Sequence, residues 1–212
     1  MQNRTENQVE LHLIRHGFTL SNEEHRYLGR TEEPLSEKGI RQLQEKRIER
    51  LREKSQDFED VDLFLSGPML RCRQTAEILF PEYSPEIVEE WREMDFGSFE
   101  GKNYQELSGN ADYQKWIESG GTLPFPEGES REVFIERSMQ GLWKALEYAK
   151  EEAEKKKKTE IKAVAVVHGG NVMAIMNRLT GEDYFDFQIK NGESLCLVFQ
   201  GQRLLSWNMD RS

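Results

Sequence analysis

The chain is predicted to form an α/β domain with a mostly parallel central sheet. Short apolar runs suited to buried strands alternate with longer segments whose apolar residues recur at helical spacing. An alternating order of strand and helix favours parallel strands. At 212 residues the chain is long enough to bury a sizeable core, and we expect a single domain over residues 1–212.

The first half of the chain opens with an apolar run at residues 9–14, which is typical of a strand. A helix is expected to begin after Ser36, a favourable N-cap residue. Further elements are then expected in this order: a buried strand at 61–65, a helix at 69–80, a third strand at 86–91, and short helices between about 104 and 119.

The second half resumes after the Gly120-Gly121 break. A long helix is predicted over residues 129–155, and the β-branched run at 161–167 suits a central buried strand. A helix at 171–179 and two final strands at 194–200 and 203–207 complete the sheet.

The formal net charge of -10 argues against a protein that coats nucleic acid or lies on a membrane surface, because either role needs a basic face. The run Lys155 to Lys158 is interpreted as the solvated end of the long helix, where positive charge complements the macrodipole. There is no apolar signal region and no run approaching about 18 apolar residues. We therefore expect a cytoplasmic protein without a membrane partner or a nucleic-acid partner.

Two cysteines, Cys72 and Cys196, lie far apart in the sequence, within segments predicted to be regular. Their spacing indicates neither a metal site nor a disulfide framework. We expect two buried free thiols.

Two predicted strands end in histidine, the first in Arg15-His16-Gly17 and the later one in His168-Gly169-Gly170. Parallel neighbours in a sheet would bring these ends together, at the edge where ligands bind in open α/β sheets. Arg71 lies in the first turn of a helix predicted to start at the same edge. Two arginines and two histidines there would neutralise a phosphate dianion.

This set of residues permits nucleophilic substitution at phosphorus. A neutral His16 could attack the phosphoryl group and form a phosphohistidine, while Arg15, Arg71 and His168 hold the phosphoryl oxygens. The leaving alkoxide needs a proton donor. Glu93 is a candidate because it precedes the turn-like Asp95-Phe96-Gly97, although most of the 39 acidic residues are expected simply to be solvated.

Four blocks in the sequence together resemble the histidine phosphatase superfamily, the phosphoglycerate-mutase-like proteins. They are LIRHGFTLSN at 13–22, SGPMLRCRQTA at 66–76, REMDFGSFEG at 92–101 and VVHGG at 166–170, and they occur in the family's order. The resemblance implies a three-layer α/β/α sandwich, a phosphohistidine mechanism and neither metal nor other cofactor.

The resemblance also implies roles for individual residues. His16 matches the nucleophile and Glu93 the proton donor, with Arg15, Arg71 and His168 as phosphate ligands. Further matches to the phosphate pocket are Thr19, Asn22 and Gly169. Alternatives stay open for two of them, because Arg15 could pair with a carboxylate and His168 could be a hydrogen-bonded core histidine.

Two other histidines receive no catalytic role. His12 lies in the middle of a strand and is expected to be either packed or exposed at an edge, and His25 lies in the following loop, where contact with substrate stays open.

The family contains mutases as well as phosphatases. Where mutases carry a tyrosine and a lysine after the acid, this chain has Phe96 and Tyr104, and residues 116–126 lack the basic residues that would grip a substrate carboxylate. The resemblance therefore favours a phosphomonoesterase over a phosphoglycerate mutase. A catalytically silent module that binds phosphorylated ligands is a third reading, which the presence of His16 and Glu93 disfavours.

The substrate is expected to be a small phosphate ester, such as α-ribazole phosphate or a sugar phosphate. A variable segment at about 98–130 is predicted to cap the site and shape the leaving-group pocket, although aromatic residues at such spacing are commonly core. The aromatic residues concerned are Tyr104, Tyr113, Trp116, Phe125 and Phe134. Nothing in the sequence separates a monomer from a homodimer.

Overall fold

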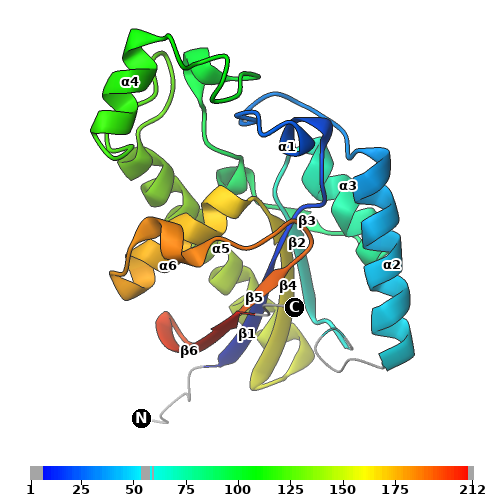
Figure 1. The fold of residues 1–212 in the computed structure, drawn as a ribbon. Coiled ribbons are helices and arrows are strands. Elements are labelled where there is room, and N and C mark those ends of the chain that lie inside the picture. Colours follow the sequence, from blue (N-terminus) through cyan, green and yellow to red (C-terminus); the bar gives the residue numbers. More distant parts are fainter. Residues whose placement is uncertain (1–6, 54–57, 59, 210–212) are drawn as a thin grey trace.

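The protein has one six-stranded sheet with the order β3-β2-β4-β1-β5-β6. A computed structural model describes residues 7–53, 58 and 60–209 (Figure 1). Strands β3, β2, β4 and β1 run parallel, whereas β5 pairs antiparallel with β1, and β6 with β5. The predicted α/β class with a mostly parallel sheet is confirmed.

The elements have the following bounds. The strands are β1 (Gln8–Arg15), β2 (Leu63–Ser66), β3 (Glu86–Ile87), β4 (Glu160–Val167), β5 (Ser194–Gln200) and β6 (Arg203–Met209). The α-helices are α1 (Leu20–Glu23), α2 (Glu37–Glu53), α3 (Leu70–Leu79), α4 (Ala111–Glu118), α5 (Arg131–Lys156) and α6 (Gly169–Thr180). The short 3₁₀ helices are η2 (Glu89–Trp91), η3 (Gly97–Phe99) and η4 (Tyr184–Phe187).

Helices cover both faces of the sheet, as the three-layer prediction requires. Helices α5 and α6 lie on one face and α2 and α3 on the other (Figure 1). The alternation of side chains along β1 serves both layers, because Leu11 and Leu13 belong to the core beneath α5 and α6 and Ile14 belongs to the core beneath α2 and α3. Ser36 caps α2 as predicted, its Oγ accepting from the Gly39 amide at 3.1 Å.

The predicted third strand is too long. Only Glu86–Ile87 pairs with β2, and the chain then turns through η2. The cause is Trp91, which is fully buried and donates from Nε1 to the Ser138 carbonyl of α5 at 3.3 Å. The indole packs against α5 where Gly141 has no side chain, since a Cβ there would lie 2.5 Å from Nε1. Packing against α5 thus ends the strand.

The segment predicted to cap the site lies above the edge of the sheet and carries α4 (Figure 1). The short helices expected between about 104 and 119 reduce to this one helix, preceded by turns. Asn110 caps α4 by accepting from the amides of Asp112 and Tyr113. The cap packs on a third core, the cap core, in which Phe99, Leu107, Tyr113 and Phe125 of the cap contact residues of α5 and α6 such as Phe134 and Ala174.

Charged groups at the far end of α5 agree with the sequence interpretation. The helix ends at Lys156, and the ammonium groups of Lys156 and Lys158 contact Asp62 Oδ1 at 3.2 and 2.6 Å. Across the described residues, we find no helix with the length and apolar character that a membrane span requires.

Arg137 of α5 ties the segment after η2 to the body of the protein. Its Nη1 donates to the carbonyls of Glu90 and Arg92 at 2.8 and 2.7 Å, and its Nη2 donates to the Glu93 carbonyl at 3.3 Å. The same guanidinium forms a bidentate ion pair with Glu129, at 3.2 and 2.8 Å. One side chain therefore joins α5, the Glu93 segment and the end of the cap.

We predict that Arg137→Met lowers the free energy of unfolding by roughly 2–4 kcal/mol, because it leaves three carbonyls and a largely buried carboxylate without their donor. Arg92→Met is the matched control. Arg92 pairs only with Glu89 on the surface, so its loss should cost less than about 1 kcal/mol. Urea denaturation measures both, and equal effects of the two substitutions would contradict the role assigned to Arg137.

Candidate active site

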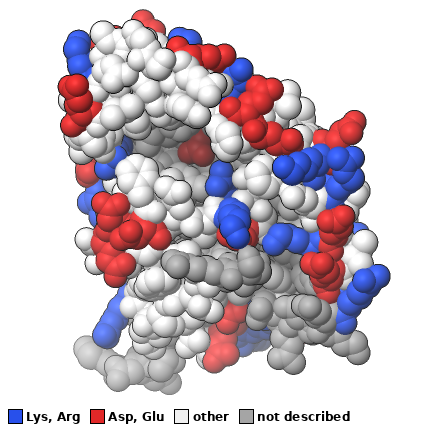
Figure 2. All heavy atoms as spheres, in the orientation of Figure 1, with Lys and Arg blue, Asp and Glu red and all other residues white. Residues whose placement is uncertain are grey.

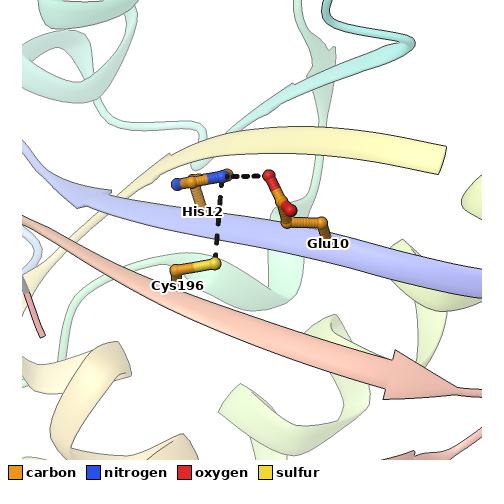
Figure 3. A group of neighbouring side chains, drawn as sticks. All are labelled: Glu10, His12 and Cys196. Carbon is orange, nitrogen blue, oxygen red and sulfur yellow. Dashed lines mark hydrogen bonds and ion pairs between the residues drawn. The ribbon is translucent and has the colours of Figure 1, made fainter. Parts of the chain in front are cut away.

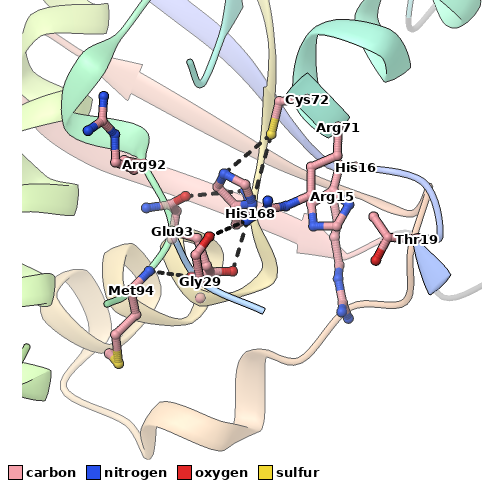
Figure 4. A network of polar contacts seen from close by, with 12 residues as sticks. Arg15, His16, Thr19, Gly29, Arg71, Cys72, Arg92, Glu93, Met94 and His168 are labelled. Carbon is pink, nitrogen blue, oxygen red and sulfur yellow. Dashed lines mark hydrogen bonds and ion pairs between the residues drawn. The ribbon is translucent and has the colours of Figure 1, made fainter. Parts of the chain in front are cut away.

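The ends of β1 and β4 bring the two predicted histidines together. The strands pair in parallel register up to Arg15 and Val167, and the His16 amide donates to the Val167 carbonyl at 3.0 Å. The rings of His16 and His168 then lie 5.1 Å apart in an edge-on arrangement (Figure 4). The predicted meeting of two strand ends is confirmed.

His16 has the tautomer that a nucleophile needs. Its Nδ1 lies 2.7 Å from the Gly17 carbonyl oxygen, which can only accept, so Nδ1 carries the proton and Nε2 keeps its lone pair. The side chain is buried, and burial together with the charges of Arg71 and Arg15 holds the pKa of His16 well below its ordinary value. The imidazole is therefore neutral at physiological pH.

Two arginines flank His16, the half-buried Arg15 and the fully buried Arg71, and each has an Nε–H donor that is not used within the described part of the chain. Arg71, in the first turn of α3 as predicted, donates to the carbonyls of Gly29 and Thr31 at 2.8 and 3.1 Å, and Arg15 donates to the Ile189 carbonyl at 2.8 Å. Among the described residues, Nε of Arg15 and Nε of Arg71 have no hydrogen-bond partner although both atoms are buried. A buried donor without a partner is costly, and an anion would satisfy both.

Glu93 lies across from His168 in the segment after η2. It is 8% exposed, its Oε1 accepts from the Met94 amide at 2.9 Å, and its Oε2 lies 3.8 Å from His168 Nδ1 (Figure 4). Burial raises the pKa of Glu93 above its ordinary value, against the opposing effects of the Met94 amide and the arginines. The break predicted after this residue is present, although the strand before it is shorter.

The beginning of α6 faces Glu93 closely. A Cβ at Gly170 would lie 2.4 Å from Glu93 Oε1, so only glycine allows this approach. His168 precedes the helix, and its amide donates to Asn171 Oδ1 at 3.2 Å, while Asn171 Nδ2 donates to Ser138 Oγ at 3.1 Å. The amino end of a helix adds partial positive charge to this edge of the sheet.

The remaining predicted residues divide into two groups. Asn22 and Gly169 line the cavity above the site. Thr19 does not. It caps α1 instead, accepting from the Asn22 amide at 3.3 Å and donating its own amide to Asn22 Oδ1 at 3.3 Å. Thr19 therefore positions Asn22, and no contact of its hydroxyl with the cavity is seen.

The other two histidines lie away from this site. His25 is exposed after α1 and does not line the cavity. His12 is 5% exposed, lies on a central strand and has the Phe58 ring 5.0 Å away. Of the two alternatives for this residue, packing inside the protein is confirmed and exposure at a sheet edge is wrong.

Neither Cys72 nor Cys196 forms a disulfide within the described residues, and Cys72 is fully buried whereas Cys196 is half-buried. Cys72 Sγ lies 3.5 Å from His168 Nε2. Burial raises the pKa of the Cys72 thiol, which keeps this neighbour of His168 uncharged.

The turn before β5 contributes a residue that the sequence analysis missed. Asn191 Nδ2 donates to the His16 carbonyl at 2.9 Å and contacts Asn22 Oδ1 at 3.2 Å. The Asn-Gly dipeptide at 191–192 is a strong turn signal directly before a strand, and Gly192 indeed has a φ of +77°. That signal places a turn there, but not beside His16.

A cavity of about 370 Å³ opens above these residues, between the cap and the body of the protein (Figure 2). Arg15 and Glu93 line it, whereas His16 and His168 lie beneath. Its outer wall is mainly aromatic and comprises Tyr27, Phe96, Trp116, Phe125, Tyr184 and Phe185. The volume suits a small molecule.

The cap aromatics named from the sequence separate into three groups. Trp116 and Phe125 line the cavity, Tyr113 and Phe134 are buried in the cap core, and Tyr104 is exposed. The sequence left open whether these aromatic residues line the pocket or form the core. Some of them do the first and others the second.

Two arginines that the sequence analysis did not predict also line the cavity, and the guanidinium group of each already contacts other side chains. Arg26 contacts Glu24 and Glu106 at 2.6 Å each, and Arg131 lies over the rings of Tyr184 and Phe185.

Comparisons with known proteins agree with this geometry. The sequence profile of the histidine phosphatase superfamily (branch 1) matches residues 11–210. An uncharacterised phosphatase of Bacillus subtilis is 31% identical over 81% of this chain and 77% of its own length. A metal-independent phosphoserine phosphatase of Arabidopsis thaliana is 30% identical over 81% of this chain and 69% of its own length.

Mutases and solved structures match as well. A 2,3-bisphosphoglycerate-dependent phosphoglycerate mutase of Arabidopsis thaliana is 24% identical over 92% of this chain, which spans 65% of that relative's length. The crystal structure of an α-ribazole phosphatase from Shigella flexneri superimposes with a TM-score of 0.76 at 23% identity, with 96% of each chain covered, which shows the shared fold. The chain belongs to the histidine phosphatase superfamily.

Proposed function

We propose that the protein is a phosphomonoesterase that works through a phosphohistidine on His16. The observation that carries the proposal is a neutral imidazole, with its Nε2 lone pair available, between two arginines whose buried Nε–H groups have no partner among the described residues. A nucleophile beside donors reserved for an anion is the arrangement that phosphoryl transfer requires.

In the first step His16 Nε2 attacks phosphorus and the bond from phosphorus to the ester oxygen breaks. Arg15 and Arg71 stabilise the charge on the phosphoryl oxygens, and Glu93 gives its proton to the departing oxygen. The raised pKa of Glu93 keeps that proton available above the pH at which an ordinary glutamate loses it.

In the second step water attacks the phosphohistidine. The Glu93 carboxylate now takes a proton from the water, and the bond from phosphorus to Nε2 breaks. Inorganic phosphate leaves, His16 returns to the neutral form, and Glu93 is protonated again. Each catalytic group ends the cycle as it began.

The outer cavity favours hydrolysis over mutase chemistry. A mutase must hold a small acid that is negatively charged at both ends, which requires cations beyond the phosphate site. Here Arg26 is already paired with two carboxylates, and Arg131 lies over aromatic rings and donates to the Gly120 carbonyl at 2.9 Å. The aromatic wall suits a ring or an apolar body instead.

The same wall favours phosphate esters whose leaving group carries a planar ring, because Trp116 and Phe125 among the lining residues offer flat aromatic surfaces. Within this class lies α-ribazole phosphate, which joins a ring system to a ribose phosphate.

The nucleophile is tested by His16→Ala, which should lower phosphate release from an aryl phosphate at least roughly a thousandfold. His25→Ala, on an exposed loop, is the control and should retain activity. Rapid quenching of the wild-type protein should trap an acid-labile phosphoenzyme that His16→Ala lacks. A wild-type protein that hydrolyses nothing would instead support a silent binding module, and a His16→Ala variant with full activity would remove His16 as the nucleophile.

The proton donor is tested by Glu93→Gln. We expect kcat/KM for an alkyl phosphate to fall by about 10²–10⁴-fold, and that for 4-nitrophenyl phosphate to fall much less, because its leaving group barely needs the proton. Glu118→Gln, on the exposed side of α4, should change neither. Full activity of Glu93→Gln on the alkyl ester would remove Glu93 from the mechanism.

A bell-shaped dependence of kcat/KM on pH follows from the two shifted groups. His16 must be neutral, so activity is lost as the pH falls through its lowered pKa, below the ordinary 6.5. Glu93 must be protonated, so activity is lost as the pH rises through its raised pKa, above the ordinary 4.5. With an alkyl phosphate, Glu93→Gln should abolish the alkaline decline; a decline that persists belongs to another group.

A substrate panel tests the leaving-group pocket. We expect α-ribazole phosphate to exceed phosphoserine, fructose bisphosphate and 3-phosphoglycerate in kcat/KM. Trp116→Ala should raise KM for the ring-bearing ester several-fold, up to about tenfold, with little effect on phosphoserine. Interconversion of 2- and 3-phosphoglycerate that outpaces phosphate release would establish the mutase alternative.

A further inference from the structure

A second cluster of reactive side chains lies on the sheet, outside the candidate active site. Glu10 and His12 project from β1 on the same side, and Cys196 is the partner of His12 across the antiparallel pairing with β5 (Figure 3). Further along the same face, Ile14 of β1 and Val164 and Val166 of β4 are buried and apolar, whereas Lys162, opposite Glu10 on β4, is half-buried. His12 is thus a buried polar side chain at the point where this face changes from apolar to polar.

The donor atoms converge on one point. His12 Nε2 lies 2.9 Å from Glu10 Oε1 and 3.8 Å from Cys196 Sγ, and all three donor atoms lie within 4.8 Å of one another. In a tetrahedral zinc site, bond lengths of about 2.0 Å to nitrogen or oxygen and about 2.3 Å to sulfur place ligand atoms roughly 3.3–3.6 Å apart. Both measured separations are within about half an ångström of those values.

The chemistry of the three ligands selects the ion. A thiolate, an imidazole and a carboxylate together suit Zn²⁺ and related transition metals, whereas Mg²⁺ and Ca²⁺ prefer oxygen ligands alone. On binding, the Cys196 thiol loses its proton to solvent, and the proton of His12 moves from Nε2 to Nδ1, so that Nε2 binds the metal while Nδ1 keeps the imidazole neutral. The Glu10 side chain is 39% accessible, which leaves the ion a path from solvent.

We propose that Glu10, His12 and Cys196 form a zinc-binding site that joins β1 to β5. The site is separate from the proposed reaction, since no step there uses these residues. Its effect would be to fasten the strand that ends in Arg15 to the neighbouring antiparallel strand. Because a preformed site binds metal in the folded state, binding stabilises that state.

The active site does not compete for the same ion. In the part of the chain that the structure describes, these three residues form the only group of three or more histidine, cysteine and acidic side chains with donor atoms this close. At the other end of β1, Arg15 and Arg71 surround His16, and two guanidinium charges repel a divalent cation.

The test titrates untagged, metal-free full-length protein with Co²⁺ and then with Zn²⁺. We expect one equivalent of Co²⁺ to produce an absorption band from thiolate coordination, which one equivalent of Zn²⁺ abolishes, and we expect Zn²⁺ to raise the Tm. Cys196→Ser should remove the thiolate band, and both Cys196→Ser and His12→Gln should weaken Zn²⁺ binding by at least on the order of a hundredfold, more than the loss of a supporting contact.

Matched controls distinguish this site from other ligands. Cys72→Ser removes the other thiol, His25→Gln removes an exposed histidine and His16→Ala removes the proposed nucleophile, and each should leave the cobalt band and Zn²⁺ affinity unchanged. If His12→Gln does not fold, as judged by circular dichroism, the same loss of Zn²⁺ affinity is measured in Cys196→Ser and Glu10→Gln instead. The proposal is overturned by absence of a thiolate band in the wild-type protein, by its survival in Cys196→Ser, or by its loss in Cys72→Ser.

Discussion

The parallel pairing of β1 with β4 is the constraint on which the site depends. The two strands run in unbroken register from Gln8 and Glu160 to Arg15 and Val167, so both strands end at the same edge of the sheet. A slip of one residue would turn every side chain of β1 to the opposite face and place Glu10 and His12 in the core that Leu11 and Leu13 now fill beneath α5 and α6. The side-chain pattern of β1 therefore favours the register that places His16 beside His168.

Burial and nearby charges together determine the protonation states of His16 and Glu93. The protein carries a net charge of -10, yet its candidate active site concentrates arginine. Burial, together with the charges of Arg71 and Arg15, lowers the pKa of His16, and both arginines have Nε–H donors that are unpaired among the described residues. The groups that would bind phosphate thus also help to keep the proposed nucleophile neutral. Glu93 remains protonatable because burial outweighs these same arginines. A local balance of burial and charge thus sets both protonation states, and the overall charge does not.

Much of this was accessible from the sequence. Periodicity predicted the sheet class, and the strand ends alone predicted the meeting of His16, His168 and Arg71. Glu93 was singled out mainly through the resemblance, because a turn after a strand does not distinguish one carboxylate among many. Arg137 and Asn191 were missed because they act on backbone carbonyls, and a carbonyl partner leaves no mark in the sequence. The length of the third strand was overestimated because Trp91 packs against α5, whose Ser138 lies 47 residues further along the chain.

The proposed site and its specificity rest on different cores. The strand ends of the candidate site are supported by the two cores on either side of the sheet, whereas the outer cavity is built by the cap core around Phe99 and Phe125. The two parts are closely joined, because Phe134 of α5 and Ala174 of α6 belong to the cap core and Glu100 accepts from the amides of Gly29 and Arg30. Strand ends and blocks shared with relatives indicate the chemistry because they depend on local strand pairing. The shape of the cavity depends instead on packing between residues far apart in the sequence, which the sequence alone does not specify.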